Sequence, residues 1–197
     1  MKKNISLLLS VFIFMTSVIL FSCISVPRKK VIISRNLTAT PVLSAEELYE
    51  YFISVRYDCD HEMVMRLANY YIEEAAAEGI NSDCAFAQMC LETGYLAFGN
   101  LVLPEMHNYC GLGAMDAEHP GEWFETEQLG VRAHIQHLQA YATTEDVPLN
   151  HELVDPRYGW VHKTKHAETI FDLAGVWATD KAYGIKIDSI LDKMEYF

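Results

Sequence analysis

Apolar residues recur at helical spacing along most of the chain from Ser44 onward. A capping-box pattern, Ser44-Ala45-Glu46-Glu47, precedes apolar positions at Leu48, Tyr51, Phe52 and Val55. A longer helix is predicted to begin after Asp60 and to end near Gly79, because the apolar residues between them fall on one face. Two amphipathic helices therefore open the folded part of the chain.

A shorter helix is predicted from Ser82 to Gly94. Ser82 suits the N-cap position, and Gly94 suits the C-terminal exit. Gln88 is the only polar residue over positions 84–91, and a helix that is apolar nearly all round is usually buried. Glu92 lies four residues after Gln88, so the two side chains share a face. The sequence thus places one ionisable group at the end of a buried helix.

Helical periodicity is lost over residues 95–125, which are rich in glycine and proline, and it returns afterwards. We predict a loop-rich lobe with short strands over these residues and a helix over residues 126–141. Residues 143–165 are predicted to be irregular, and helices near Ala167–Trp177 and Lys181–Met194 close the chain. This order indicates an α+β, mainly α fold, in which a helical lobe and a small irregular or β lobe bound a cleft.

The first 22 residues have the composition of a signal peptide. Lys2 and Lys3 form a basic start, and Ile5–Phe21 is an apolar run broken only by small polar residues. Leu20-Phe21-Ser22-Cys23 resembles a lipobox, which predicts that residues 1–22 are a lipoprotein-type signal peptide and that Cys23 is lipidated. A plain transmembrane anchor is the alternative, because the run approaches the length that spans a bilayer.

Both interpretations place the domain in the cell envelope, as a membrane-anchored protein that faces the periplasm or the exterior. Residues 23–43 contain Pro27, Pro41 and several basic residues without a helical period. We therefore predict a lipidated cysteine and a linker over residues 23–43, followed by a folded domain over residues 44–197.

The charge balance narrows the choice of partners. The chain carries 15 Lys and Arg against 27 Asp and Glu, which gives a formal net charge of −12 at pH 7. Residues 1–22 contribute two lysines and no acid, so the rest of the chain has a net charge near −14. An acidic domain is poorly suited to nucleic acid or to an anionic membrane face. We expect a monomer that meets the membrane only through its lipid anchor.

Four cysteines remain beside Cys23, namely Cys59, Cys84, Cys90 and Cys110. An even number permits disulfides in an exported protein, but Cys84 and Cys90 point to different faces of one predicted helix. Their spacing is not that of a four-cysteine zinc site. Four buried small hydrophobic residues, or one disulfide, are expected.

Two histidine pairs have spacings that suit a metal ion, His134 with His137 and His162 with His166. No further ligand lies at a diagnostic spacing, so neither a metal nor another cofactor is expected. His134 and His137 are predicted to form hydrogen bonds within the helix packing. A cysteine–histidine peptidase is disfavoured, because apolar surroundings do not stabilise a thiolate.

Glu92 has the position of a general acid. Burial of an unpaired carboxylate is costly and raises its pKa. A carboxylic acid that stays protonated near neutral pH is what general acid catalysis needs. A Glu92 that is solvated at the helix end, or paired with a cation, is the structural alternative.

Five segments of the chain support a catalytic interpretation. They are Gln88–Gly94, Asn108–Gly113, Gly130–Leu138, Asp155–Tyr158 and Trp177–Ile187. In this order they resemble the motifs of bacterial N-acetylglucosaminidases of glycoside hydrolase family 73, and the resemblance covers about residues 62–195. It implies a lysozyme-like fold and cleavage of the peptidoglycan glycan strand after N-acetylglucosamine. The partner implied is therefore the peptidoglycan glycan strand.

The resemblance also implies roles for single residues. Glu92 matches the general acid, and Tyr183 matches a tyrosine beside the reacting sugar, where its phenol would orient the 2-acetamido group or the attacking water. A tyrosine that only packs between helices is the alternative. Asn108 would hydrogen-bond substrate or fix the turn that follows it. The substrate-binding residues expected on this basis are Gln88, Asn108, Tyr109 and Trp177.

A second carboxylate is harder to assign. Glycoside hydrolysis usually uses an acid and a second carboxylate, and better-studied members of the family carry the latter on a lobe hairpin without a clear equivalent in this sequence. From the lobe residues Glu118, Glu122, Glu125 and Glu127, we select Glu122. If none serves, the substrate's own acetamido group would be the nucleophile.

Three functions follow from these observations. The first is a peptidoglycan hydrolase of the endo-β-N-acetylglucosaminidase type, with Glu92 as general acid. The second is a non-catalytic peptidoglycan-binding lipoprotein, which the missing second carboxylate motivates. The third is a lytic transglycosylase, which keeps the fold and works with a single acid.

Overall fold

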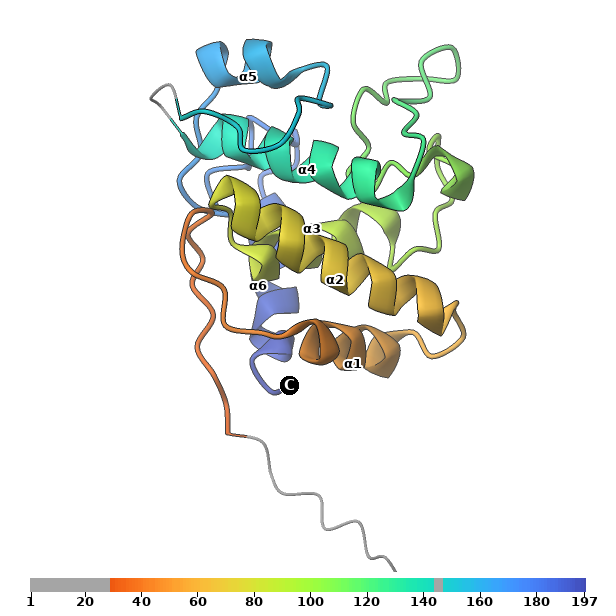
Figure 1. Cartoon of the computed structure of the whole chain (residues 1–197), viewed down its shortest axis with the longest axis vertical. Coiled ribbons are helices and arrows are strands. Elements are labelled where there is room, and N and C mark those ends of the chain that lie inside the picture. The colour runs from red at the N-terminus through yellow and green to blue at the C-terminus, as the bar shows by residue number, and fades with distance from the viewer. Residues whose placement is uncertain (1–28, 144–146) are drawn as a thin grey trace, which may run out of the picture.

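Six α-helices and one 3₁₀ helix form the regular structure of the computed structural model, which describes residues 29–143 and 147–197 (Figure 1). Within these ranges, β-structure is limited to three isolated bridges. The predicted mainly α fold is confirmed, and the lobe of residues 95–125 is built of turns and one 3₁₀ helix instead of strands. The elements are α1 (Ala45–Val55), α2 (His61–Glu78), α3 (Ser82–Thr93), η1 (Pro104–Met106), α4 (Glu127–Ala142), α5 (Tyr158–Thr164) and α6 (Tyr183–Met194).

The expected signal peptide, Cys23 and the first part of the expected linker lie outside the described residues. None of the described helices has the length and apolar character needed to cross a bilayer. The membrane anchor therefore stays a prediction from the sequence.

Side-chain caps fix where the first three helices begin. The capping box at Ser44 and Glu47 is present, and the Asp60 carboxylate accepts from the backbone of Met63. The N-cap of α3 is Asn81 instead of Ser82, which is the first helical residue. Asn81 takes the cap position because its side-chain amide also donates to the carbonyl oxygens of Ser34 and Asn36, at 3.1 and 3.3 Å. The N-cap of α3 therefore depends on contacts with residues that are distant in the sequence.

Helix α3 lies at the centre of the fold, behind α2 in the view of Figure 1. It contacts α1, α2, α4 and α6. Its side chains from Ser82 to Cys90 are buried on every face, including Phe86 and Met89, as the sequence predicts. Burial of each such side chain stabilises the fold by about 1.5–3 kcal/mol. The helix that carries Glu92 is therefore held from all sides.

The lobe is fastened to the first turn of α4. A Cβ atom on Gly130 would lie 1.8 Å from the carbonyl oxygen of His107, so only glycine lets the two backbones approach this closely. The His107 ring donates from Nδ1 to the carbonyl of Phe124, and the Phe124 amide donates to the carbonyl of Met106. The lobe (green in Figure 1) thereby stands over the C-terminal end of α3.

The end of the chain differs from the sequence prediction in two places. Residues 143–165 include the short helix α5, whereas residues 167–177 form successive turns instead of a helix. The apolar residues Ala167, Ile170 and Leu173 are buried, as a helix would bury them. Their backbone partners lie elsewhere, since the Ala167 amide donates to Tyr141 and the Ile170 amide to Arg35. Tertiary hydrogen bonds at these two residues, followed by local turns, take the place of a helix.

Residues 31–43 pack against the helices along a stretch that the sequence assigns to a linker. Ile33, Leu37 and Leu43 are buried in the main core. The Val31 amide donates to the carbonyl of Glu195, and the Asn81 amide donates to that of Leu37. This segment has no helical period because it is an extended strap, and its three apolar residues belong to the folded domain.

Arg35 fastens the strap to α6. Its guanidinium forms ion pairs with Asp188, Asp192 and Glu195, of which the Asp188 and Glu195 contacts measure 2.6 Å. The Glu195 side chain is only 5 % exposed, and it also meets the exposed Lys30 at 2.9 Å. Burial raises the pKa of Glu195, but its bonds to Lys30 and Arg35 outweigh this and lower the pKa overall.

Replacement of Arg35 by alanine is expected to lower the free energy of unfolding by about 2 kcal/mol, because the buried Glu195 carboxylate loses its main partner. Urea denaturation at neutral pH measures the change. Lys30→Ala is the matched control, since it removes an exposed partner of the same carboxylate and should cost much less. Equal urea midpoints for the Arg35 variant and the wild type would show that the ion pairs of Arg35 contribute little to stability.

Candidate active site

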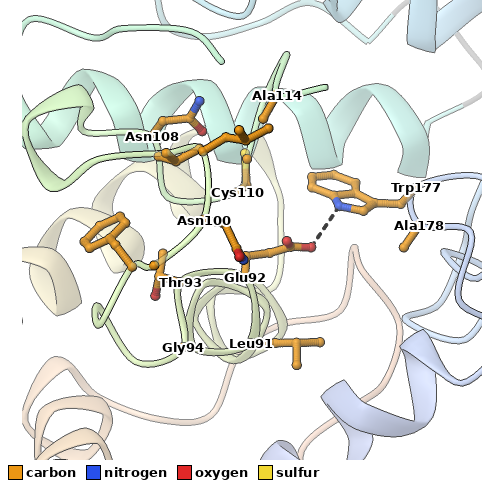
Figure 2. A pocket seen from close by; sticks show the side chains of 15 residues that line it. Leu91, Glu92, Thr93, Gly94, Asn100, Asn108, Cys110, Ala114, Trp177 and Ala178 are labelled. Atoms are coloured by element: carbon orange, nitrogen blue, oxygen red, sulfur yellow. Dashed lines mark hydrogen bonds between the residues drawn. The ribbon is translucent and has the colours of Figure 1, made fainter. Parts of the chain in front are cut away.

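A cleft of about 480 Å³ opens at the C-terminal end of α3 (Figure 2). Its walls are residues 91–94 of α3, residues 98–102 and parts of 108–114 from the lobe, and Trp177 with Ala178 from the late turns. Glu92 is the only carboxylate among these lining residues. The cleft between a helical lobe and an irregular lobe is thus where the sequence predicts it.

Glu92 is half-buried, and one of its two carboxylate oxygens is held by two donors. Oε1 accepts from the Tyr183 hydroxyl and, at 3.2 Å, from Nε1 of Trp177. Figure 2 shows the Glu92 side chain extending toward the Trp177 indole. Oε2 has no hydrogen-bond partner among the described residues. Burial raises the pKa of Glu92, and the Tyr183 and Trp177 bonds oppose this in part.

This asymmetry decides where an acid proton would reside. Both neighbours of Oε1 are donors, because an indole N–H cannot accept and the Tyr183 hydroxyl gives its proton to Glu92. A proton on Oε1 would oppose those donors, whereas Oε2 is free. The protonated form of Glu92 therefore carries its proton on Oε2.

Tyr183 reaches Glu92 from the first turn of α6. Its hydroxyl donates to Oε1 of Glu92 and accepts at 2.8 Å from the side-chain amide of Gln88. Burial, with the nearby Glu92 carboxylate, raises the pKa of Tyr183 well above its usual range, so the phenol stays a neutral donor. The structure places Tyr183 beside Glu92, and the Tyr183 hydroxyl engages protein groups on both sides.

Gly184 sets the position of Tyr183. A Cβ atom on Gly184 would lie 2.5 Å from Cα of Phe171 and 2.6 Å from the carbonyl oxygen of Ile170. The start of α6 therefore lies against the turn at residues 170–171 with no room for a side chain. The sequence contains this glycine in a family-like segment, but its spacing alone did not indicate a close backbone approach.

We expect Gly184→Ala to lower the free energy of unfolding by about 2–3 kcal/mol and to reduce catalysis, because α6 must shift and carry Tyr183 with it. Thermal unfolding and glycan cleavage measure the two effects. Gly159→Ala is the control, since Gly159 is an exposed glycine of α5 whose added Cβ would meet nothing within 4 Å. Gly159→Ala should leave the cleavage rate unchanged. A wild-type cleavage rate in Gly184→Ala would refute the idea that the close approach of α6 to residues 170–171 positions Tyr183.

Gln88 does not contact the cleft. Its side chain is completely buried, donating from Nε2 to the Tyr183 hydroxyl and accepting through Oε1 from Nε2 of His134 at 3.1 Å. The prediction that Gln88 and Glu92 share a face is correct, since both meet Tyr183. The expected substrate-binding role is replaced by a link between two helices.

Asn108 and Tyr109 also differ from the expected sugar contacts. Asn108 lies at the cleft wall, but it is 1 % exposed and its amide donates to the carbonyls of Leu112 and Glu122 while its oxygen accepts from the Leu112 amide. It fixes the turn, which is the alternative the sequence left open. Tyr109 is 0 % exposed and does not line the cleft, because its ring belongs to the main core.

Glu122 is half-buried and does not line the cleft. Its carboxylate packs beside Gly113. Its backbone is tied to the wall through Leu112 and Asn108.

Trp177 lines the cleft, as expected of a substrate-binding residue, and also contributes the second donor to Glu92. Its ring packs edge-on against His137 at a centroid distance of 4.9 Å, and His137 in turn binds Asp155 at 2.7 Å. His137 and His134 therefore form hydrogen bonds within the packing, as predicted. The sequence did not reveal that the indole N–H points at the acid.

The chain leaves α3 in an uncommon conformation that shapes one wall of the cleft. Gly94, Tyr95, Leu96 and Phe98 have φ angles of 57°, 56°, 60° and 48°, in the left-handed region. Each non-glycine residue there costs on the order of 1 kcal/mol. Hydrogen bonds from Arg56 to the Tyr95 carbonyl and from the Leu96 amide to Thr93 hold the turn.

The four cysteines outside the predicted lipobox are free. Cys59 is half-buried and the others are buried, in line with the expectation of small hydrophobic residues. Cys110 lines the cleft, and burial raises the pKa of its thiol well above the usual range. Over residues 29–143 and 147–197, no cluster of three or more His, Cys, Asp or Glu side chains has the geometry of a metal site.

Comparison with known proteins agrees with this geometry. Residues 68–196 match the model of the glucosaminidase family, described as mannosyl-glycoprotein endo-beta-N-acetylglucosaminidase. The chain is also 41 % identical over 152 residues to an uncharacterized protein of Borreliella burgdorferi. The aligned region covers 77 % of this chain and 73 % of that protein. No solved structure matches the chain. The protein belongs to the glucosaminidase family and is a glycoside hydrolase of the kind that acts on peptidoglycan.

Proposed function

We propose that the protein is an endo-β-N-acetylglucosaminidase that cleaves the peptidoglycan glycan strand after N-acetylglucosamine, with Glu92 as general acid. The observation that carries the proposal is the Glu92 carboxyl group at the cleft, with one oxygen held by two donors and the other without a hydrogen-bond partner among the described residues. Its raised pKa favours the protonated form that the reaction needs.

In the proposed reaction, a glycan strand lies in the cleft with the scissile glycosidic oxygen next to Oε2 of Glu92. Glu92 gives its proton to that oxygen while the bond from the sugar C1 to the oxygen breaks. The Tyr183 hydroxyl and the Trp177 indole stabilise the carboxylate that forms, because both donate to its other oxygen. Glu92 later takes a proton from the water that attacks C1.

The nucleophile in this scheme is the 2-acetamido group of the substrate. Among the described residues that line the cleft, Glu92 is the only acid, which supports a mechanism in which no second protein carboxylate attacks C1. The carbonyl oxygen of the acetamido group attacks C1 as the leaving group departs, and water then opens the cyclic intermediate. This route needs one carboxylic acid and a substrate that carries the acetamido group.

Glu122→Gln is accordingly expected to leave the cleavage rate within about threefold of the wild type, whereas loss of a catalytic carboxylate costs at least 10²-fold. Release of reducing ends from purified peptidoglycan measures the rate. A 10²-fold loss in a variant that is folded, as judged by circular dichroism, would restore Glu122 as the second catalytic carboxylate.

A lytic transglycosylase is the second candidate, and the single cleft carboxylate favours it. In that reaction an internal sugar hydroxyl attacks in place of water and leaves an anhydro-muramic end. Digestion of purified peptidoglycan by the full chain, followed by reduction and mass spectrometry, separates the two by the mass of one water. Reducible N-acetylglucosamine ends support the hydrolase, and anhydro ends support the transglycosylase. Binding to the wall without fragments would indicate a non-catalytic binding protein.

We further propose that the protein works as a membrane-anchored lipoprotein of the cell envelope, with Cys23 as the lipidated residue. The strap begins at Val31, eight residues after Cys23, so a short segment separates the proposed anchor from the packed domain. Metabolic labelling with a fatty-acid analogue, in the wild type and in Cys23→Ala, is the measurement. Label that persists in the variant would contradict lipidation at this position.

A further inference from the structure

A line of buried hydrogen bonds leads from α2 to the proposed acid. The Tyr71 hydroxyl meets Nδ1 of His134 at 2.8 Å, and Nε2 of His134 meets Oε1 of Gln88 at 3.1 Å. Nε2 of Gln88 donates to the Tyr183 hydroxyl, which donates to Glu92. The first four side chains are at most 5 % exposed, so water does not compete for these bonds. The line connects α2, α4, α3 and α6.

The bonding partners fix the direction of every donor. An amide oxygen can only accept, so Oε1 of Gln88 requires a proton on Nε2 of His134. Burial lowers the pKa of His134 to about 3, so the ring is neutral and carries that proton alone. Nδ1 is then an acceptor, and the Tyr71 hydroxyl must donate to it. All four bonds therefore point toward Glu92.

We propose that His134 and Tyr71 are positioning residues for the reaction, which align the hydrogen bonds of Gln88 and Tyr183 so that the Tyr183 proton is always directed at Oε1 of Glu92. The proposal rests on the proposed function of Glu92 as the acid and extends the active site by two residues that no substrate touches. Neither residue lines the cleft.

The direction of these hydrogen bonds matters because they stabilise the Glu92 carboxylate, which is the charged group left after Glu92 gives up its proton. In a chain of hydrogen bonds each donor polarises the next, and the effect is strongest in a buried, low-dielectric setting. The chain therefore stabilises the Glu92 carboxylate more than a Tyr183 hydroxyl alone would. It also keeps Oε1 occupied, which leaves the acid proton on Oε2 at the cleft.

Other titratable groups near the line do not supply this function. Cys110 approaches Glu92 from the lobe with a thiol whose pKa is raised well above the usual range, so it stays neutral. His137 lies one turn from His134 on α4, but its Nδ1 binds Asp155. On α6, the group that faces Glu92 is Tyr183 itself.

The first test uses the full-length chain in detergent micelles and needs no substrate. Nitrogen NMR of the histidine rings is expected to show His134 as the neutral Nε2–H form across the pH range of the folded protein. The Glu92 carboxyl titration, followed by its side-chain carbon shift, is expected to move to higher pH in His134→Met and to stay near the wild-type position in His134→Gln, whose amide restores an N–H donor. A Nδ1–H ring, or an unmoved titration in His134→Met, would overturn the proposal.

The second test measures cleavage of soluble, uncrosslinked glycan strands. His134→Met is expected to lower kcat about tenfold with KM unchanged, and His134→Gln to recover most of the loss. Tyr71→Phe should lower kcat less, and Tyr158→Phe is its control, because that hydroxyl also binds α4, through Gln139, away from Glu92. Equal losses in both tyrosine variants would indicate a purely structural effect.

The two tests separate the inference from the proposed function. A wild-type protein that cleaves no glycan refutes the catalytic function, yet the NMR titration still shows whether His134 acts on Glu92. If His134→Met does not fold, Tyr71→Phe carries the titration test, since it removes one hydroxyl and no other atom.

Discussion

Replacement of Glu92 by glutamine is expected to lower the rate of glycan cleavage by about 10³-fold while the protein stays folded. Glutamine has the size of glutamic acid, and its amide oxygen can accept the Tyr183 and Trp177 bonds in place of Oε1. Its amide nitrogen would occupy the position of Oε2, and an amide N–H is far too weak an acid to protonate a leaving group. Reducing ends released from purified peptidoglycan measure the loss, with circular dichroism as the test of folding.

The same variant should be at least as stable as the wild type. Burial raises the pKa of Glu92, so in the pH range above its ordinary value of 4.5 the unfolded chain releases this proton before the folded chain does. The contribution of Glu92 to stability is thus fully present at lower pH and is lost as pH rises through the folded-state value. Because glutamine does not titrate, its advantage over the wild type should grow with pH over this window. A variant that is both active and less stable would refute the assignment.

The pH dependence of the wild-type rate follows from the same shift. The acid must be protonated, so kcat should fall on the basic side with a midpoint above the ordinary pKa of a glutamate. A kcat–pH profile measured on soluble glycan strands tests this expectation. A midpoint at or below pH 4.5, the ordinary value, would show that Glu92 is not the group that must be protonated.

The sequence predicted the parts of the fold that depend on local signals. The caps at Ser44 and Asp60, and the buried character of α3, are visible in residue type and spacing. The same reasoning failed where distant contacts decide the backbone. Residues 167–177 have helical spacing of apolar residues, but the Ala167 and Ile170 amides bond to the distant carbonyls of Tyr141 and Arg35, and the amides after them close local turns. The strap over residues 31–43 has no period at all, because single apolar residues and Arg35 hold it.

The site also combines residues that local sequence signals indicate with contacts that the sequence does not predict. Glu92 was indicated because an acid at the end of a buried helix is unusual, and Tyr183 because it lies in a family-like segment. The directions of the bonds between them were not predictable, since they depend on how α3, α4 and α6 cross. Gln88 and Tyr109 were assigned to substrate because sequence motifs do not distinguish a residue that supports the site from one that contacts the ligand.

Tyr183→Phe is expected to lower kcat by about 10²-fold and to leave KM unchanged. The change removes the stronger of the two donors to Oε1 of Glu92 and leaves Trp177 as the other, at 3.2 Å. Without that donor the carboxylate formed in the reaction is less stable, and the acid proton can move to Oε1, away from the cleft. The Gln88 amide also loses its acceptor, so the free energy of unfolding should fall by about 1–3 kcal/mol.

The direction of the pH shift in this variant separates two roles of the phenol. The Tyr183 bond lowers the pKa of Glu92 against the effect of burial, so its removal should move the basic limb of the kcat profile to higher pH. Trp177→Phe is the comparison, because it removes the longer bond and should shift the limb less. If the Tyr183 variant instead raised KM and left both kcat and the limb in place, the phenol would bind the sugar. The buried hydroxyl, donating to Glu92 and accepting from Gln88, argues for a role in holding the acid.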